Sequence, residues 1–360
     1  MHLKELASSQ STSTESKPQS LSFLHYIHNF RGLSILFIVA THVLAKLDWK
    51  DDKAEKLANI LIGNGTVFFV FIAGFLFQFL SQKYKFKNYL NKKIQYVIVP
   101  YLIVSIPGLI YVFSKHQLPD WFNYQFFGLP LWHQVIMCLL TGAHMLQYWF
   151  IPMITIFYIV SPILIWVDRR PWFYCFLPLL IVVTLIVPRP DFNNDSFQSF
   201  IHFFSIYLAG MFCSHFRERF FIFMRQWYIL PTCAFIILTA LEYFWMPVPV
   251  NTNSVNSVSK LILSGLLIYF FWLNEQHLPK TIDKTMSLLA EYSFGIFFLH
   301  EYFILGGLSL AGKIGIKSQF VNYSLPTFVI QCFFSIGGSI IAIIIIKKIF
   351  RKNSRWVVGC

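Results

Sequence analysis

The sequence predicts an all-α, polytopic integral membrane protein with about ten transmembrane helices. The chain has 360 residues, of which 56% are hydrophobic and 12% are charged, whereas soluble domains usually carry about 25% charged residues. Several apolar stretches also approach the roughly 20 residues that an α-helix needs to cross a bilayer. Composition and stretch length together exclude an ordinary soluble fold.

Ten stretches have the length and apolar character of membrane spans. They are 27–46, 60–82, 94–114, 148–167, 172–187, 198–215, 221–243, 258–275, 287–308 and 324–346. We expect them to form one transmembrane domain over residues 23–350. Residues 1–22 are polar and rich in Ser, Thr and Gln, which predicts a flexible cytoplasmic tail. Residues 351–360 predict a basic cytoplasmic tail.

The net charge of +13 indicates membrane topology rather than nucleic-acid binding. With the N-terminus in the cytoplasm, most Lys and Arg residues fall on the cytoplasmic side, as the positive-inside rule requires. The sequence therefore predicts a multi-pass plasma-membrane protein with both termini cytoplasmic. Membrane lipids are the expected partners of the basic loops, with acidic cytoplasmic ligands as a second possibility and no role for nucleic acid.

The remaining composition gives two further expectations. The six cysteines are scattered, with no CxxC or zinc-like spacing, so neither a disulfide framework nor a metal site is expected. Residues 115–147 are rich in Trp and Phe but interrupted by proline, which predicts a segment at the outer interface or re-entering the membrane. Residues 83–93 are basic and amphipathic and are expected to lie along the cytoplasmic face.

Two ionisable side chains, Arg31 and His42, lie inside the first apolar stretch. Charged groups at membrane depth are costly and are usually retained for a function. Their spacing corresponds to about three helical turns and about 16 Å along the axis, so both side chains project from one face. His42 suits a general base because imidazole titrates near working pH. The alternatives are a histidine hydrogen-bonded between helices and an arginine that reaches the headgroups.

Four segments, in order, resemble the membrane-bound acyltransferase family 3 of bacterial surface-polysaccharide O-acyltransferases. The first is Arg31-Gly32 followed by His42, a spacing typical of that family's first span. The others are Phe68–Leu76, Trp149–Pro162 and Ser293–Glu301. Because they run from the first predicted span to the ninth, the resemblance covers nearly the whole chain.

The resemblance implies an O-acyltransferase of the bacterial inner membrane. It would move an acyl group, most often acetyl, from cytosolic acyl-CoA to a hydroxyl of a lipid-linked or cell-surface glycan such as lipopolysaccharide, with no permanently bound cofactor. Its implied catalytic residues are His42, Arg31 and His300. Trp149 and Glu301 are candidates for lining the acceptor site or cavity. Glu301 is equally compatible with a solvated position near the outer interface.

The donor-binding segment departs from the family pattern. Members often carry an Arg-x-x-Arg pair ahead of a Pro-Tyr at the third span, and here Pro100-Tyr101 follows Lys93-Ile94-Gln95-Tyr96. Lys93 and its neighbour Lys92 are the expected donor-binding residues. Lysine is a point charge and does not reproduce the bidentate recognition of phosphate by arginine.

An oxyanion forms when a hydroxyl attacks a thioester carbonyl, and it needs hydrogen-bond donors aimed at it. The turn at residues 63–66 and Ser293 are the candidates for those donors. Two other functions are also compatible with the sequence. A transporter or flippase of a lipid-linked or charged substrate would place Arg and His around a polar cavity, although no internal repeat supports it. A scaffold for polysaccharide export would tolerate the loss of His42.

Overall fold

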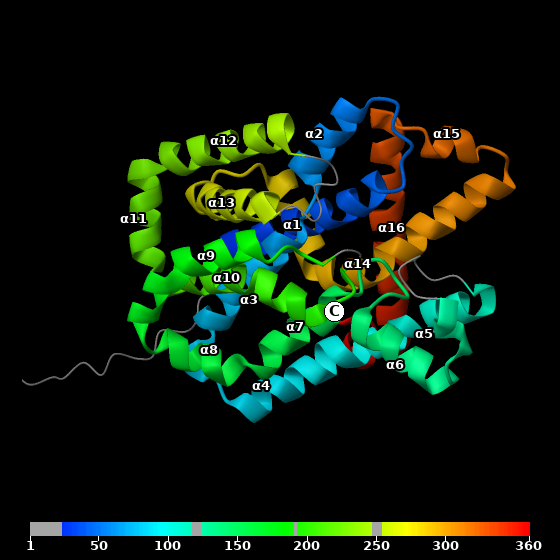
Figure 1. The fold of residues 1–360 in the computed structure, drawn as a ribbon, viewed down its shortest axis with the longest axis horizontal. Coiled ribbons are helices and arrows are strands. Elements are labelled where there is room, and N and C mark those ends of the chain that lie inside the picture. Colours follow the sequence, from blue (N-terminus) through cyan, green and yellow to red (C-terminus); the bar gives the residue numbers. More distant parts are fainter. Residues whose placement is uncertain (1–23, 117–123, 191–192, 247–253) are drawn as a thin grey trace, which may run out of the picture.

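The computed structural model describes residues 24–116, 124–190, 193–246 and 254–360, and these residues fold into helices with one isolated bridge between Asp48 and Asn322 (Figure 1). The predicted tail 1–22 lies outside the described residues, as does 117–123 of the Trp-rich segment. The α-helices are α1 (His25–Leu44), α2 (Asp52–Ile62), α3 (Thr66–Phe79), α4 (Phe86–Lys93), α5 (Val99–Lys115), α6 (Leu131–Thr141), α7 (Phe150–Ile159), α8 (Ser161–Asp168), α9 (Leu177–Ile186), α10 (Ser196–His215), α11 (Arg217–Trp227), α12 (Ile229–Trp245), α13 (Ser254–Leu273), α14 (Lys280–Lys313), α15 (Lys317–Val321), α16 (Leu325–Phe350) and α17 (Ser354–Val358).

The all-α, polytopic prediction is confirmed. Seven helical segments of the described chain are long and apolar enough to cross a membrane, and two bent pairs raise the number to nine. The bent pairs, α7 with α8 and α11 with α12, fall on the predicted spans 148–167 and 221–243. The remaining predicted span, 172–187, is the apolar helical segment Pro171–Ile186, which is shorter than the other spans. Nine of the ten predicted spans therefore correspond to candidate spans of the structure, and the tenth corresponds to this short helix.

The bend of 58° between α7 and α8 has a local cause. Pro162 occupies the first turn of α8, and a proline has no N–H to continue the hydrogen bonding of a preceding helix. Helix α7 consequently ends at Ile159. A hydropathy pattern does not register such a bend, because both arms are equally apolar.

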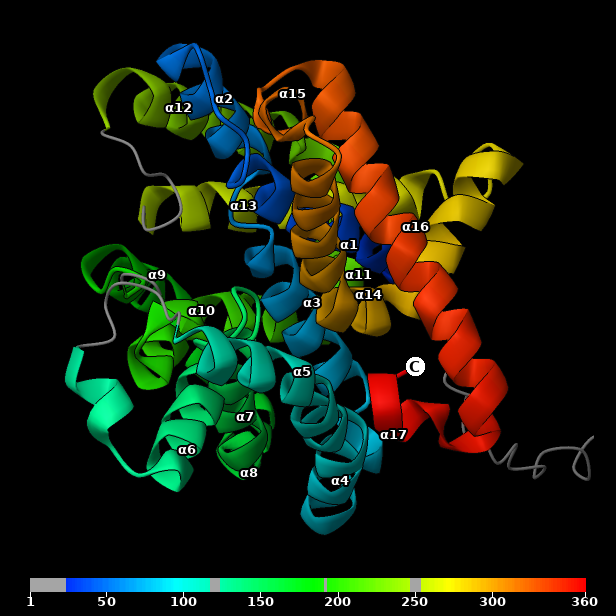
Figure 2. The same ribbon diagram turned by 90° about the vertical axis from the view of Figure 1, so that its right-hand side faces the viewer.

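Helix α1 lies at the centre of the helices and packs most extensively against α14 (Figures 1 and 2). The two backbones meet at Gly32, where a Cβ atom would lie 2.1 Å from the carbonyl oxygen of Met286. Small residues allow membrane helices to approach this closely. At the start of both helices, the Asp283 carboxylate accepts hydrogen bonds from His25 at 2.7 Å and Asn29 at 2.8 Å. These contacts fix how the two helices align.

Two other segments differ from simple expectations. Helix α4 continues through a π-helix, Ile94–Ile98, into α5, so the basic segment and the third span form one helical segment, Phe86–Lys115. The predicted basic tail 351–360 is folded, because Arg351–Asn353 forms a 3₁₀ turn and α17 packs back against α5.

Of the Trp-rich segment, the described part contains α6, an apolar helix of 11 residues. That length is too short for a complete span.

The contact at Gly32 yields a prediction about stability. We expect Gly32→Ala to destabilise the protein by about 1–3 kcal/mol, because the added methyl group forces α1 and α14 apart. The measurement is the apparent melting temperature of the purified protein in detergent. Gly306→Ala is the control, because this glycine of α14 has open space where a Cβ would stand. An equal effect of both substitutions would show that helix separation at Gly32 is not the cause.

Candidate active site

Arg31 and His42 open onto two neighbouring cavities. Arg31 lines a cavity of about 520 Å³, and His42 lines a much smaller one. Phe69 of α3 and Phe150 of α7 line both cavities. The face of α1 that carries both ionisable groups therefore runs along two spaces that share an aromatic wall.

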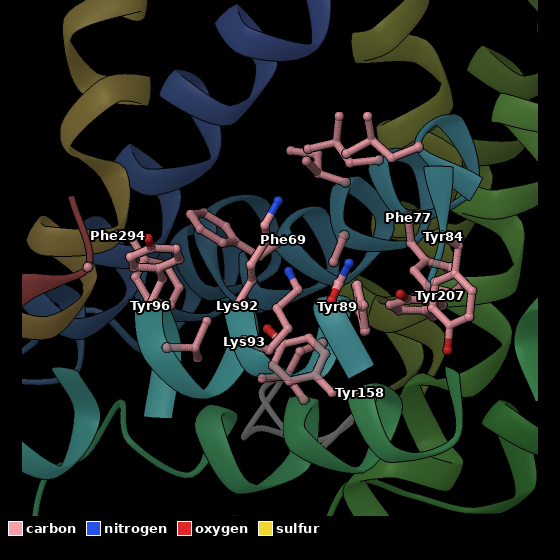
Figure 3. A pocket seen from close by; sticks show the side chains of 18 of the residues that line it. Phe69, Phe77, Tyr84, Tyr89, Lys92, Lys93, Tyr96, Tyr158, Tyr207 and Phe294 are labelled. Carbon is pink, nitrogen blue, oxygen red and sulfur yellow. The ribbon is translucent and has the colours of Figure 1, made fainter. Parts of the chain in front are cut away.

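The larger space, called here the basic cavity, is lined by cations and tyrosines (Figure 3). No Asp or Glu is among the described residues that line it. The cationic lining residues are Arg31, Lys83, Lys85, Lys92, Lys93 and Arg355, and the tyrosines are Tyr84, Tyr89, Tyr96, Tyr158 and Tyr207. Clustered cations without carboxylates raise the local concentration of anions, so this cavity suits a polyanionic ligand.

The two lysines expected to bind a donor both line the basic cavity, together with Arg31. The Lys93 ammonium lies 4.8 Å from the ring centroid of Tyr158 and 5.3 Å from that of Tyr89. Aromatic faces stabilise an ammonium that has lost part of its hydration. Arg31 has no carboxylate within salt-bridge distance among the described residues, so its charge is available to a ligand. The sequence reasoning missed the tyrosines, although Tyr84, Tyr89 and Tyr96 flank the lysines in the chain.

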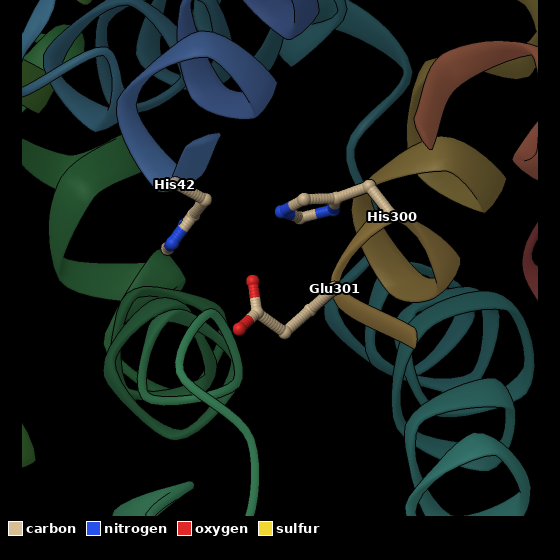
Figure 4. Close-up of side chains that lie close together, drawn as sticks. All are labelled: His42, His300 and Glu301. Carbon is tan, nitrogen blue, oxygen red and sulfur yellow. The ribbon is translucent and has the colours of Figure 1, made fainter. Parts of the chain in front are cut away.

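Around His42, helices α1 and α14 bring together the His–His–Glu cluster, which consists of His42, His300 and Glu301 (Figure 4). The two imidazole centroids are 5.0 Å apart. One nitrogen of each ring and one oxygen of Glu301 all lie within 4.8 Å of one another. The three side chains face a common gap, although His300 and Glu301 are adjacent in a helix and begin about 100° apart. The length of the glutamate side chain brings its carboxylate to the histidines.

His300 is fully buried and its orientation is fixed by its own helix. Its Nδ1 lies 2.9 Å from the carbonyl oxygen of Ile296 and donates a proton to it. The Nε2 atom therefore carries the lone pair, and it has no hydrogen-bond partner among the described residues. A buried acceptor without a partner is costly. Nε2 is consequently ready to accept a proton or hydrogen bond from a ligand in the gap.

Glu301 is buried rather than solvated, with a relative exposure of 2%. The possibility of a solvated position near the interface is therefore wrong. Its Oε1 lies 3.5 Å from the ammonium of Lys46, two residues beyond the end of α1, and its Oε2 has no partner among the described residues. Lys46 lies about one helical turn beyond His42, but no pattern in the chain indicates that it pairs with Glu301 of another helix. The ion pair offsets part of the cost of burying a carboxylate.

The cluster also has the donor set of a three-ligand zinc site, with two imidazoles and a carboxylate. The expectation of no metal site rested on cysteine spacing and did not consider this combination. The Lys46 ammonium beside Glu301 disfavours a second cation at the same carboxylate, because like charges repel strongly at short range in a buried site. The arrangement is better suited to handling protons.

Trp149 lines the small cavity beside His42 and is 5% exposed. The guanidinium of Arg189 lies 4.3 Å from the centroid of its indole, and the ring of Phe203 stacks on it at 5.9 Å. Arg189 also donates a hydrogen bond to the side-chain oxygen of Asn64 at 3.3 Å. Sequence reasoning missed Arg189, which belongs to the loop after α9.

Comparison with known protein families identifies the family of this chain. A family described as "Acyltransferase domain", acyltransferase 3, matches residues 24–347. The chain belongs to the acyltransferase 3 family. Membership implies acyl transfer. A search of curated proteins and a search of solved structures each found no match.

An acyltransferase 3 protein needs hydrogen-bond donors that stabilise the oxyanion formed during acyl transfer. Ser293 is fully buried and donates to the Ala290 carbonyl oxygen of its own helix at 2.9 Å, so its hydroxyl is already engaged. In the turn at 63–66, the Asn64 amide donates to the Ser257 hydroxyl. Thr66 lines the small cavity together with His42 and Gln147. Among the sequence candidates, the structure therefore places Thr66 at the site and Ser293 away from it.

The Lys46–Glu301 pair yields a prediction. We expect Lys46→Met to destabilise the protein by about 2 kcal/mol, because it leaves a buried carboxylate without its cation. The double substitution Lys46→Met/Glu301→Gln should recover most of the loss, since the remaining amide carries no charge. Apparent melting temperatures in detergent provide the comparison, with the exposed Lys50→Met as control. If the double variant is no more stable than Lys46→Met, the loss comes from packing and not from the unpaired charge.

Proposed function

We propose that this acyltransferase 3 protein transfers an acyl group, most often acetyl, from acyl-CoA to a hydroxyl group of a lipid-linked or cell-surface glycan. The donor binds from the Arg31 side, which is the cytoplasmic side by the distribution of basic residues. The acceptor reaches His42 from the opposite side. The location is the bacterial inner membrane, with both chain termini in the cytoplasm.

The donor assignment is supported by the chemistry of the basic cavity. Coenzyme A carries several phosphates on its nucleotide end and a thioester at the end of a long, flexible arm. Arg31, Lys92 and Lys93 supply positive charge, and no described residue that lines the cavity brings a competing carboxylate. The arm then extends along α1 toward His42, past Phe69 and Phe150, over the roughly 16 Å that separates the two residues along the helix axis.

The single observation that carries the proposal is the convergence of His42, His300 and Glu301 next to the wall of this cavity. His42 removes the proton from the acceptor hydroxyl as its oxygen attacks the thioester carbonyl. The C–S bond then breaks, the ester forms, and the proton passes from His42 to the CoA thiolate. His300 accepts a hydrogen bond from the acceptor or from the His42 imidazole through its free Nε2.

Glu301 stabilises the positive charge that His42 acquires during the reaction, because a carboxylate within a few ångströms favours imidazolium. Its ion pair with Lys46 favours the ionised carboxylate, although it offsets only part of the cost of burial. Trp149 lines the small cavity with the part of its indole that Arg189 and Phe203 leave uncovered, and an acceptor beside His42 contacts it there.

The test compares ester-linked acyl groups on surface glycans from cells that express the native chain, His42→Ala or no copy. We expect His42→Ala to lower the acyl content at least about a hundredfold, because general-base catalysis contributes that much. Membrane protein levels must be matched between strains. His277→Ala is the control, since this exposed histidine lies in the loop before α14.

Acyl groups that appear with the native chain and His277→Ala but not with His42→Ala would support the mechanism. Equal acylation in the native and His42→Ala strains would remove His42 from the chemistry. Unchanged acylation without any copy of the chain, together with altered glycan export, would favour a transporter instead.

A further inference from the structure

The C-terminal residues form part of the basic cavity. After α16, the 3₁₀ turn Arg351–Asn353 reverses the chain, and α17 returns it beside α5 and α14 (Figure 2). Arg355 and Gly359 of this segment line the cavity together with Arg31. A region that its composition marks as a basic tail therefore contributes a wall of the candidate donor site.

Burial and backbone conformation determine the place of this segment. The Val358 side chain is fully buried, and within the segment the Ser354 hydroxyl donates to the backbone oxygen of Cys360 at 3.3 Å. Gly359 has a φ of +75°, and a Cβ there would lie 2.4 Å from the Phe294 ring and 3.3 Å from the Tyr96 carbonyl oxygen. Only glycine accommodates both the left-handed backbone and this close approach. The position of Arg355 is thus determined by packing.

The guanidinium of Arg355 lies on the aromatic face of Tyr96, with its central carbon 4.7 Å from the ring centroid. Stacking of this kind orients the planar group and leaves its N–H edge free. No carboxylate of the described residues forms a salt bridge with it. Arg355 is exposed at the rim of the cavity, so a ligand entering from solution reaches it directly.

The turn of helix beneath Arg355 explains why a guanidinium at this place matters. Along residues 93–96, the helix contributes one cation, Lys93, and one aromatic side chain, Tyr96. Both side chains line the cavity. Arg355 stacks on Tyr96 and so brings a positive charge to the position that the helix itself leaves neutral.

We infer that Arg355 binds a phosphate group of the CoA donor, and that the C-terminal segment thereby contributes a residue to the donor site. This inference rests on the proposed use of the cavity for acyl-CoA. A guanidinium pairs with phosphate through two parallel N–H donors, which a lysine cannot do. Arg355 is consequently a specificity-determining residue for the donor, although it lies about 260 residues beyond Lys93 in the chain.

The experiment measures the dissociation constant of CoA for the purified full chain in lipid nanodiscs. We expect Arg355→Ala to weaken binding about tenfold, since a charge-assisted hydrogen bond contributes about that factor. Arg355→Lys should recover part of the affinity. The double variant Arg355→Ala/Tyr96→Arg should recover most of it, because it moves the guanidinium to the helix. Lys352→Ala is the control, as this exposed lysine of the same segment does not line the cavity.

The outcomes separate the two proposals. If the native chain binds no CoA, the donor assignment of the proposed function is wrong. If the native chain binds CoA and Arg355→Ala binds it equally well, the donor assignment stands and the role of Arg355 is wrong. Weakened binding that Tyr96→Arg does not restore would indicate that Arg355 acts through packing of the C-terminal segment, which also overturns the inference. Apparent melting temperatures identify any variant that does not fold.

Discussion

The close contact between α1 and α14 is the constraint on which the site depends. Gly32 brings the two backbones together beside Arg31, and the hydrogen bonds of Asp283 with His25 and Asn29 fix the alignment of the helices. All three residues of the His–His–Glu cluster come from these two helices. Because each helix is rigid over its length, one contact near Arg31 determines where His42 meets His300 and Glu301 several turns away.

The same helix pair separates two electrostatic environments. The Arg31 end opens onto a cavity whose charged lining residues, among those the structure describes, are all cations, and the His42 end faces a buried carboxylate paired with Lys46. A polyanionic group is therefore stabilised at one end and a developing positive charge at the other. This separation of charge suits the proposed reaction, in which cations bind the phosphates of the donor at one end and the thioester reaches a general base at the other. The length of α1 between Arg31 and His42 sets the distance over which the donor must extend.

Much of this could be predicted from the sequence, and the exceptions have physical causes. Apolar length identified the helices, and helical spacing placed Arg31 and His42 on one face. Lys92 and Lys93 were named because the segment ahead of Pro100-Tyr101 resembles the family's donor-binding segment. Arg189 and Arg355 were missed, since they belong to a loop and a short terminal segment where no periodicity indicates what they contact. The burial of Glu301 was equally hidden, because it depends on Lys46, which lies about 250 residues away in the chain.

The aromatic wall between the two cavities indicates how acyl transfer can compete with hydrolysis. Phe69 and Phe150 line both spaces, and Ile38, Trp149 and Phe297 add further apolar surface to the small cavity. In the proposed reaction, a thioester that passes between these two rings leaves water behind, because the phenyl rings offer no hydrogen-bond partner. With His42 as the proposed general base, water that follows the donor would be activated as readily as the hydroxyl of the proposed acceptor. Replacing Phe69 or Phe150 by a smaller side chain would widen this passage and would therefore favour hydrolysis over transfer. Removing the His42 imidazole would slow both reactions alike.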